Sequence, residues 1–235
     1  MEAVISERQS DFKIGVKAGI SIAIGYMPIA LTFGLLAKST GLSLVETVMM
    51  SLLVFAGAAQ YISLNLIAAG TTGLEIVLTT FIVNIRHFLM SASLTNKAEP
   101  DHPLKKALYA FGITDETFSV AATTPGKLSS SYLFGIMLIS YGSWVVFSGI
   151  GHVIGANLPD VLQKSMGIAL YAMFIGLLVP SMKKSRKVVL LAGAAAIFNS
   201  LFSFVLSAGW SIVTATLLSA IVVEFLMPEV QEESA

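Results

Sequence analysis

Long stretches without a charged residue constrain this chain more than any other feature. The first runs for twenty residues, from Ala18 to Ala37, and a helix rising about 1.5 Å per residue needs about twenty apolar residues to cross a hydrocarbon core of about 30 Å. Only 12% of the residues are charged, whereas soluble domains carry about 25%. The apolar runs are continuous rather than alternating, which favours helices over membrane strands. We therefore predict an all-α polytopic membrane protein that resides in a lipid bilayer.

Composition also excludes several classes of function. The fourteen basic and fourteen acidic residues cancel, which leaves no electrostatic case for nucleic acid as a partner. The chain has no cysteine, so disulfides, thiolate metal sites and cysteine catalysis are excluded. The residues before the first apolar run show no small-residue cleavage site, and we interpret that run as a retained span rather than a signal peptide. No metal site is expected.

Charged residues divide the chain, taken as a single transmembrane domain over 1–235, into about seven or eight transmembrane or discontinuous helices. The expected apolar segments are 18–37, 46–75, 75–95, 128–158, 161–182 and 188–223. The last segment is long enough for two spans that turn near 207–210. A hydrophilic loop at 96–106 contains two prolines, and the tail at 228–235 is acidic.

Residues 107–124 decide the topology, and two arrangements stay open. If this segment crosses the membrane and the N-terminus is cytoplasmic, Lys97, Lys105 and Lys106 fall outside, against the positive-inside rule. If it does not cross, an external N-terminus places that loop and the basic cluster at 183–187 on the cytoplasmic side. The basic residues near the N-terminus then lie outside, against the same rule. We favour eight segments with the N-terminus inside.

The two halves of the chain echo each other weakly. The stretch that begins at Gly19 resembles the one that begins at Gly135 in length and in the placing of glycine and of a loop. Structural repeats are common in secondary transporters. We expect repeat halves at 13–124 and 128–227, parallel if each half holds an even number of segments and inverted if it holds an odd number.

The segment at 75–95 carries ionisable residues at its middle, where a spanning helix lies deepest. Arg86 and His87 are adjacent there, and a charge at that depth costs at least about 2.5–3.5 kcal/mol on insertion scales. A polar stripe with the helical spacing i, i+4, i+7, i+11 consists of Thr80, Asn84, His87 and Ser91. Arg86 is rotated by about 100° from His87, so we expect it to face a separate partner. Whether Arg86 is structural or functional stays open.

The stretch "GITDETFSV" has the pattern of a helix start. Thr114 is a favourable capping residue, and Asp115 and Glu116 then fall in the first turn, where the helix dipole favours acids. Either acid is a candidate partner for Arg86. If this helix begins at membrane depth, the element is discontinuous and lines a cavity.

The stretch "VFAGAAQYISLN" contains four small residues at 56–59. Such clusters permit close helix packing. The alternative is an unwound point whose free N–H groups face a substrate carboxylate. Gln60 adds an amide to this region.

These three stretches together resemble the motifs of the AzlC family, the large subunit of bacterial branched-chain amino acid exporters. The resemblance runs from about Ile14 to Val120, and beyond residue 130 it rests on hydropathy and length. The matching positions are Phe55, Ala56, Gly57, Ala58 and Gln60 for an F-A-G-A-x-Q element, Asn84, Arg86 and His87 for N-x-R-H, and Thr114, Asp115 and Glu116 for T-D-E.

The resemblance implies a secondary transporter that exports valine, leucine, isoleucine and in some members methionine, driven by the proton gradient. It implies a location in the bacterial cytoplasmic (inner) membrane and a small hydrophobic AzlD-like partner subunit. It implies neither an enzyme nor a cofactor. A passive channel or scaffold subunit is the alternative. An intramembrane enzyme is disfavoured, because no Ser nucleophile motif or H-E-x-x-H motif is present.

A neutral amino acid is a zwitterion with an apolar side chain, which assigns expected roles. Donors for the carboxylate are the backbone at Gly57 and Ala58, or Arg86. The expected acceptors for the ammonium group are Asp115, Gln60 and Asn84, and the expected apolar wall includes Phe55 and Phe118. Proton coupling falls to His87, whose unperturbed pKa is about 6.5, within a charge network that also contains Arg86, Asp115 and Glu116.

Overall fold

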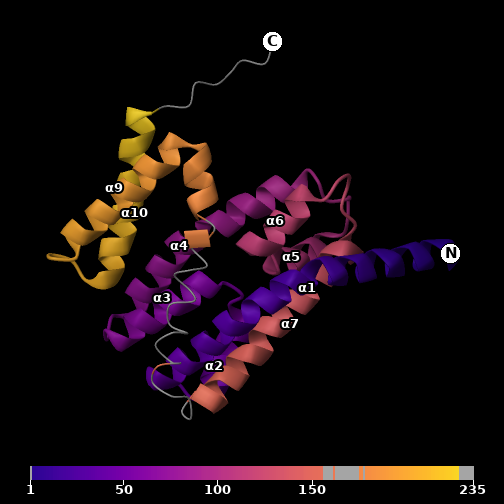
Figure 1. Cartoon of the computed structure of the whole chain (residues 1–235), viewed down its shortest axis with the longest axis horizontal. Helices are drawn as coiled ribbons and strands as arrows, with labels where there is room; N and C mark the ends of the chain where they lie inside the picture. Colours follow the sequence, from indigo (N-terminus) through magenta and orange to yellow (C-terminus); the bar gives the residue numbers. More distant parts are fainter. Residues whose placement is uncertain (1, 156–160, 162–174, 177, 228–235) are drawn as a thin grey trace. The chain divides into compact units, whose positions relative to one another are not determined.

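The computed structural model describes residues 2–155, 161, 175–176 and 178–227 (Figure 1). The expected segment at 161–182 therefore lies largely outside the described residues, and the acidic tail at 228–235 lies entirely outside them. Contacts divide the chain into two compact units, which we call unit 1 (1–64 and 83–169) and unit 2 (65–82 and 170–235). The described residues contain helices and no β-strand, which confirms the all-α prediction.

The helices of unit 1 and unit 2 follow the apolar segments, with breaks inside two of them. They are α1 (Glu2–Ser39), α2 (Leu44–Leu53), α3 (Gly57–Ala68), α4 (Gly73–Thr95), α5 (Pro103–Phe111), α6 (Asp115–Thr123), α7 (Ser130–Ile154), α9 (Arg186–Phe202) and α10 (Ala208–Leu226). Among the described residues, four helices are long and apolar enough to span a membrane, namely the part of α1 from Asp11 onward, α4, α7 and α10. The chain is a membrane protein.

Helices α1 and α7 lie side by side and form the scaffold of unit 1 (Figure 1). A Cβ atom added at Gly15 would collide with the backbone of Tyr132, and one added at Gly34 would collide with the backbone of Ser148. Small residues allow transmembrane helices to approach this closely. Gly15 and Tyr132 lie in the first halves of α1 and α7, and Gly34 and Ser148 lie in their second halves. The two helices therefore run in the same direction.

Helix α2 starts at the C-terminal end of α7 and runs to its middle. The hydroxyl of Thr47 lies 2.9 Å from Nδ1 of His152, near the end of α7. The hydroxyl of Tyr141, at mid-length of α7, donates to the carbonyl of Leu52 at 2.8 Å. The helix then ends, and residues 54–56 are not helical.

Helix α3 turns back from this break toward the end where α2 began. The side-chain amide of Gln60 donates to the hydroxyl of Ser51 at 3.3 Å, so the two helices lie against each other. The ring of Tyr61 packs against Phe33, beside the contact of Gly34 with α7. The pair α2–α3 is therefore re-entrant: it reaches the middle of unit 1 and returns.

Helix α4 runs opposite to α7 through unit 1. Arg86 lines a pocket with Trp144 at the middle of α7, whereas Leu94 lines a cavity with Leu133 near its start. The predicted helix at 75–95 is present as α4 and is long and apolar enough to span a membrane, and its C-terminal half places the ionisable residues at mid-height beside α7.

Helices α5 and α6 form a second re-entrant pair, from the opposite end. Tyr109 contacts Phe134 near the start of α7, and Phe111 contacts Tyr141 at its middle, with ring centroids 6.1 Å and 5.7 Å apart. Helix α6 then returns, because the hydroxyl of Thr124 lies 2.9 Å from that of Tyr132.

The favoured eighth crossing at 107–124 was therefore wrong. Gly112 breaks the helix where it packs against Met137, and Thr114 starts a new helix immediately afterwards. A break and a cap within three residues allow the chain to reverse at mid-height instead of continuing across.

Unit 2 contains a helical hairpin of α9 and α10 (Figure 1). Its two helices are joined by residues 203–207, close to the predicted turn. Lys187 and Glu224 form an ion pair of 2.7 Å between the start of one helix and the end of the other. Glu75 of α4 accepts hydrogen bonds from the hydroxyl of Ser207 and the backbone N–H of Gly209 at the start of α10.

Candidate functional site

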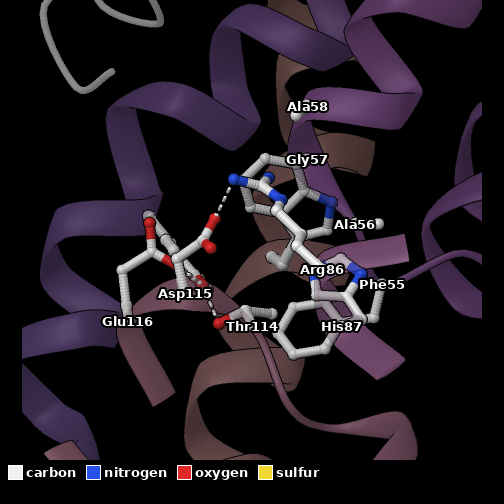
Figure 2. A pocket seen from close by; sticks show the side chains of 11 residues that line it. Phe55, Ala56, Gly57, Ala58, Arg86, His87, Thr114, Asp115 and Glu116 are labelled. Atoms are coloured by element: carbon white, nitrogen blue, oxygen red, sulfur yellow. Dashed lines mark hydrogen bonds and ion pairs between the residues drawn. The ribbon is translucent and has the colours of Figure 1, made fainter. Parts of the chain in front are cut away.

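A polar pocket lies where the tips of the two re-entrant pairs meet, between α1, α4 and α7. Its lining comes from five places in the chain and consists of Tyr26, Phe55, Ala56, Gly57, Ala58, Arg86, His87, Thr114, Asp115, Glu116 and Trp144. Figure 2 shows these side chains converging from separate helices. All three sequence motifs therefore meet in one place, although about 60 residues separate the first from the last.

An ion pair occupies the centre of the pocket. Nη1 of Arg86 lies 2.8 Å from Oδ2 of Asp115, and the two side chains are 36% and 24% exposed (Figure 2). Asp115, rather than Glu116, is thus the partner of Arg86. Nε of Arg86 is buried and has no hydrogen-bond partner among the described residues, so the guanidinium keeps one free donor.

Arg86 has the separate partner that the sequence predicted, but the expectation that it faces away from His87 was wrong. Both side chains line the same pocket. The rotation of about 100° between neighbours does not separate them, because the tips of both re-entrant pairs wrap around this face of α4.

Side chains close the N-terminus of α6. The hydroxyl of Thr114 accepts from the backbone N–H of Thr117 as the helix cap, which confirms the predicted helix start. The phenol of Tyr26 donates to Oε2 of Glu116 at 2.6 Å and lies 2.7 Å from Oγ1 of Thr114. This helix end presents acceptors to the pocket, because Asp115 and Glu116 stand in its first turn.

The N-terminus of α3 is open by comparison. The helix starts at Gly57, and among the described residues no side chain accepts from the N–H groups of its first three residues. Such groups have no partner within the helix, and the dipole places partial positive charge there. A Cβ atom added at Gly57 would lie 2.7 Å from the ring of Trp144. The chain is unwound at residues 54–56, and glycine permits the close packing of Trp144 against the start of α3, while the role of its N–H groups stays a prediction.

The pocket is small and carries excess negative charge. Its volume is about 20 Å³, which is room for a single water molecule. One guanidinium and two carboxylates face it, so its formal charge is −1 while His87 is neutral. The arrangement offers donors on the α3 and Arg86 side and acceptors on the α6 side.

Three of the predicted site residues do not line this pocket. Gln60 is fully buried, accepts from the indole N–H of Trp144 at 2.7 Å and donates to Ser51. Asn84 carries a buried carbonyl oxygen without a partner among the described residues. Phe118 lies on α6, one turn past the lining residues.

Sequence reasoning missed two aromatic residues of the pocket, Tyr26 and Trp144. Their rings contact each other, with centroids 5.2 Å apart, and each also binds a residue of a sequence motif. Trp144 is one of only two tryptophans in the chain, which is a weak signal. Neither lies near a motif in the sequence, because α1 and α7 bring them to the site only by their packing.

Comparisons with known proteins agree on one family. The family model described as "AzlC protein" matches residues 21–158, and so continues through α7, past the last motif. The Escherichia coli protein named "Inner membrane protein YgaZ" is 32% identical over 189 residues, covering 77% of each chain. An "Uncharacterized membrane protein" of Archaeoglobus fulgidus is 33% identical over 176 residues, covering 73% of this chain and 76% of the relative.

A third relative has a name that states a function. The Bacillus subtilis protein named "Branched-chain amino acid transport protein AzlC" is 26% identical over 172 residues, covering 72% of this chain and 66% of the relative. No solved structure matches the chain.

Proposed function

Because the chain belongs to the AzlC family, we propose that it is a proton-coupled secondary transporter that exports neutral aliphatic amino acids. Valine, leucine, isoleucine and methionine are the proposed substrates. The name of the Bacillus subtilis relative supports the substrate class. The matched region spans every residue that lines the polar pocket.

One observation carries the proposal: the ion pair between Arg86 and Asp115 lies in a pocket that is also lined by the start of α3 and the start of α6. An amino acid carries the same two charges. Its carboxylate replaces Asp115 on Arg86 and takes the free Nε donor and the N–H groups at Gly57 and Ala58. Its ammonium group replaces Arg86 on Asp115, with Glu116 beside it. The exchange leaves both Arg86 and Asp115 paired with an opposite charge, which avoids the penalty of an isolated buried charge at either residue.

The apolar side chain of the substrate packs on the aromatic wall. Phe55 contacts Tyr26 edge to face, with centroids 6.1 Å apart, and Tyr26 contacts Trp144. Gln60 holds the indole of Trp144 and so acts as a positioning residue rather than a ligand. Asn84 keeps its unpartnered acceptor on the same helix as Arg86. A charged substrate side chain would find no partner on this wall.

The two re-entrant pairs provide a basis for alternating access. One enters from each end of unit 1, and the pocket lies between their tips. Transporters commonly bind substrates near the midplane at discontinuous helices. A pocket with room for one water is a closed state, which favours a gated transporter over an open channel. Substrate binding then requires the ion pair to open.

The charge of the pocket supports proton coupling. The site has a formal charge of −1, and a zwitterion does not change that value. Burial disfavours net charge, so one bound proton neutralises the loaded pocket. In the loaded pocket Asp115 is paired with the ammonium group of the substrate, and the proton is therefore assigned to His87 and Glu116.

A small hydrophobic AzlD-like subunit is the proposed partner, and the bacterial cytoplasmic (inner) membrane is the proposed location. The name of the Escherichia coli relative supports the location. No cofactor is required, because the proton gradient supplies the driving force.

Flux measurements in sealed vesicles test the proposal. The chain, with the partner subunit encoded beside it, is reconstituted, and radiolabelled leucine flux is followed with and without a pH gradient. We expect saturable flux that the gradient accelerates. The variants His87→Gln and Glu116→Gln should flatten the pH dependence.

Three results would contradict the proposal. Flux that does not saturate and ignores the pH gradient indicates a channel. A chemically altered product indicates an enzyme. Wild-type rate and pH dependence in His87→Ala and Asp115→Asn would remove these residues from the site.

A further inference from the structure

Most of the lysines of unit 1 that the structure describes gather at one end. Helices α1 and α7 both start there and α4 ends there, so that end carries Lys13, Lys17, Lys97, Lys105, Lys106 and Lys127. The opposite end, where α1 meets α2, carries Lys38. Basic residues accumulate on the cytoplasmic side of membrane proteins. The described lysines of unit 1 follow this rule because α5–α6 returns to the end from which it enters, and only Lys38 among them lies at the opposite end. The basic end is the cytoplasmic end, and the pair α5–α6 enters from the cytoplasm.

A second cavity lies in this cytoplasmic half, between α4 and α5. Its volume is about 260 Å³, more than ten times that of the polar pocket. We call this cavity the cytoplasmic groove. It is lined by Phe88, Ser91, Ala92, Leu94, Thr95, Lys106, Tyr109, Ala110 and Ile113.

The cytoplasmic groove adjoins the polar pocket along two elements. His87 lines the pocket, and Ser91, one turn later on the same polar stripe of α4, lines the groove. Ile113 lines the groove and Thr114 lines the pocket. The stripe therefore forms a polar track that leads from the groove to the pocket.

The lining of the groove fits an amphipathic small molecule. Most of its surface is apolar, while Ser91 and Thr95 supply hydroxyls and Lys106 supplies an ammonium group. Lys106 has no ion pair among the described residues, whereas its neighbour Lys105 pairs with Asp101 at 3.2 Å. A lipid tail gains nothing from the hydroxyl track, which favours an amino acid as the occupant.

We propose that the cytoplasmic groove is a loading site for aliphatic amino acids, in which Lys106 receives the carboxylate and the apolar lining receives the side chain. The substrate then passes along Ser91 to His87 when the ion pair between Arg86 and Asp115 opens. This inference rests on the proposed function and adds to it a second substrate site and the side from which it loads.

Thiol labelling tests the location, because the natural chain has no cysteine. The variant Ser91→Cys is treated with a membrane-impermeant thiol reagent in right-side-out and inside-out vesicles. We expect labelling from the cytoplasmic face only. Leucine at about ten times its Kd should slow labelling about tenfold, because about one site in ten is then free. Glutamate should not protect. The control Leu138→Cys, exposed on α7, should show no leucine protection.

Two lysine variants test the chemistry. Lys106→Gln should raise the KM for cytoplasmic leucine by up to about fivefold, the factor expected of a partly exposed ion pair, with little change in maximal rate. Lys105→Gln is the matched control, because Lys105 lies outside the groove, and should leave the KM unchanged. Ala110→Phe, which fills the groove, should raise the KM for leucine more than that for alanine.

The outcomes separate the two proposals. If the wild type moves leucine but Ser91→Cys is labelled only from outside, or is not protected, the loading site is wrong and the transport function stands. Protection by fatty acid but not by leucine makes the groove a lipid site. If the wild type moves no leucine with its partner present, the transport function fails and the loading site fails with it.

Discussion

The two helices that begin at the centre of unit 1 share a geometry and differ in chemistry. Both α3 and α6 start at mid-height after a short break and point their N-termini into the same pocket. The N-terminus of α6 is capped by Thr114 and carries two carboxylates. The N-terminus of α3 is formed by small residues, and no side chain in the described part of the chain accepts a hydrogen bond from its first N–H groups.

This difference gives the pocket its polarity. A bare N-terminus is a ready site for an anion, whereas one that carries acids has become a site for a cation. In the proposed loaded state, Arg86 and the N-terminus of α3 bind the substrate carboxylate together. In the closed state, Arg86 pairs with Asp115 in the first turn of α6. Two similar backbone elements thus make a site with one donor side and one acceptor side, which matches a zwitterion.

Removing the carboxylate of Asp115, in the first turn of α6, is the strongest test of this polarity. Asp115→Asn leaves Arg86 unpaired and removes the ammonium acceptor. Truncating one partner of a buried charge pair costs about 2–5 kcal/mol. Because this pair is partly exposed, we expect a cost of about 2 kcal/mol, which corresponds to a leucine affinity about thirtyfold lower. Leucine counterflow in vesicles measures the loss. Glu116→Gln keeps the ion pair, and an equal loss of binding in that variant would contradict the assignment of Asp115.

A methyl group added at Gly57, the first residue of α3, tests the side of the pocket that offers hydrogen-bond donors. In Gly57→Ala the new methyl group meets the ring of Trp144, and overpacking of this kind costs about 1–3 kcal/mol. We expect a lower thermal stability and a several-fold lower leucine affinity, because the displaced ring of Trp144 lines the pocket. Gly142→Ala is the matched control, because no atom lies within 4 Å of its added Cβ. Equal effects in both variants would show that the open N-terminus has no special role.

The cap of α6 can be compared with that of α2, which lies outside the pocket. Thr114→Ala and Ser43→Ala each remove a capping box, and each should cost about 1 kcal/mol, or about 2–4 °C in Tm for a chain of this size. Thermal unfolding in detergent measures this. Only Thr114→Ala should also weaken leucine binding, because Thr114 contacts Tyr26. A loss of binding in both would mean that capping alone is responsible.

The smallest effect is expected outside both helix starts, at Asp101. A hydrogen bond from Ser130, with help from the backbone N–H of His102 and from Lys105, lowers the pKa of this partly buried carboxyl from 3.8 to about 2. A lowered folded-state pKa gives stability that is present above about pH 4 and is lost as the pH falls toward 2. Asp101 therefore does not titrate between pH 5 and 8, and Asp101→Asn should leave the pH profile of leucine flux unchanged. A shifted profile would move the coupling proton away from the pocket.

The sequence predicted the elements better than their connections. The apolar runs located α1, α4 and α7, and the small-residue and T-D-E stretches located the two breaks. The failure at 107–124 has a physical reason. Hydropathy and length report that a segment is buried, but Gly112 and Thr114 reverse the chain only because Met137 and Tyr26 are there to pack against it. The repeat halves at 13–124 and 128–227 stay a prediction.

The sequence by itself determined that the chain is an all-helical membrane protein with ionisable residues at membrane depth, because burial in lipid requires long uncharged helices and makes every intramembrane charge conspicuous. Only the tertiary structure decided that Arg86 pairs with Asp115, that His87 shares their pocket, and that Tyr26 and Trp144 complete it. Those relations depend on the glycine contacts between α1 and α7 and on two reversals of the chain, and such long-range packing leaves little trace in local sequence.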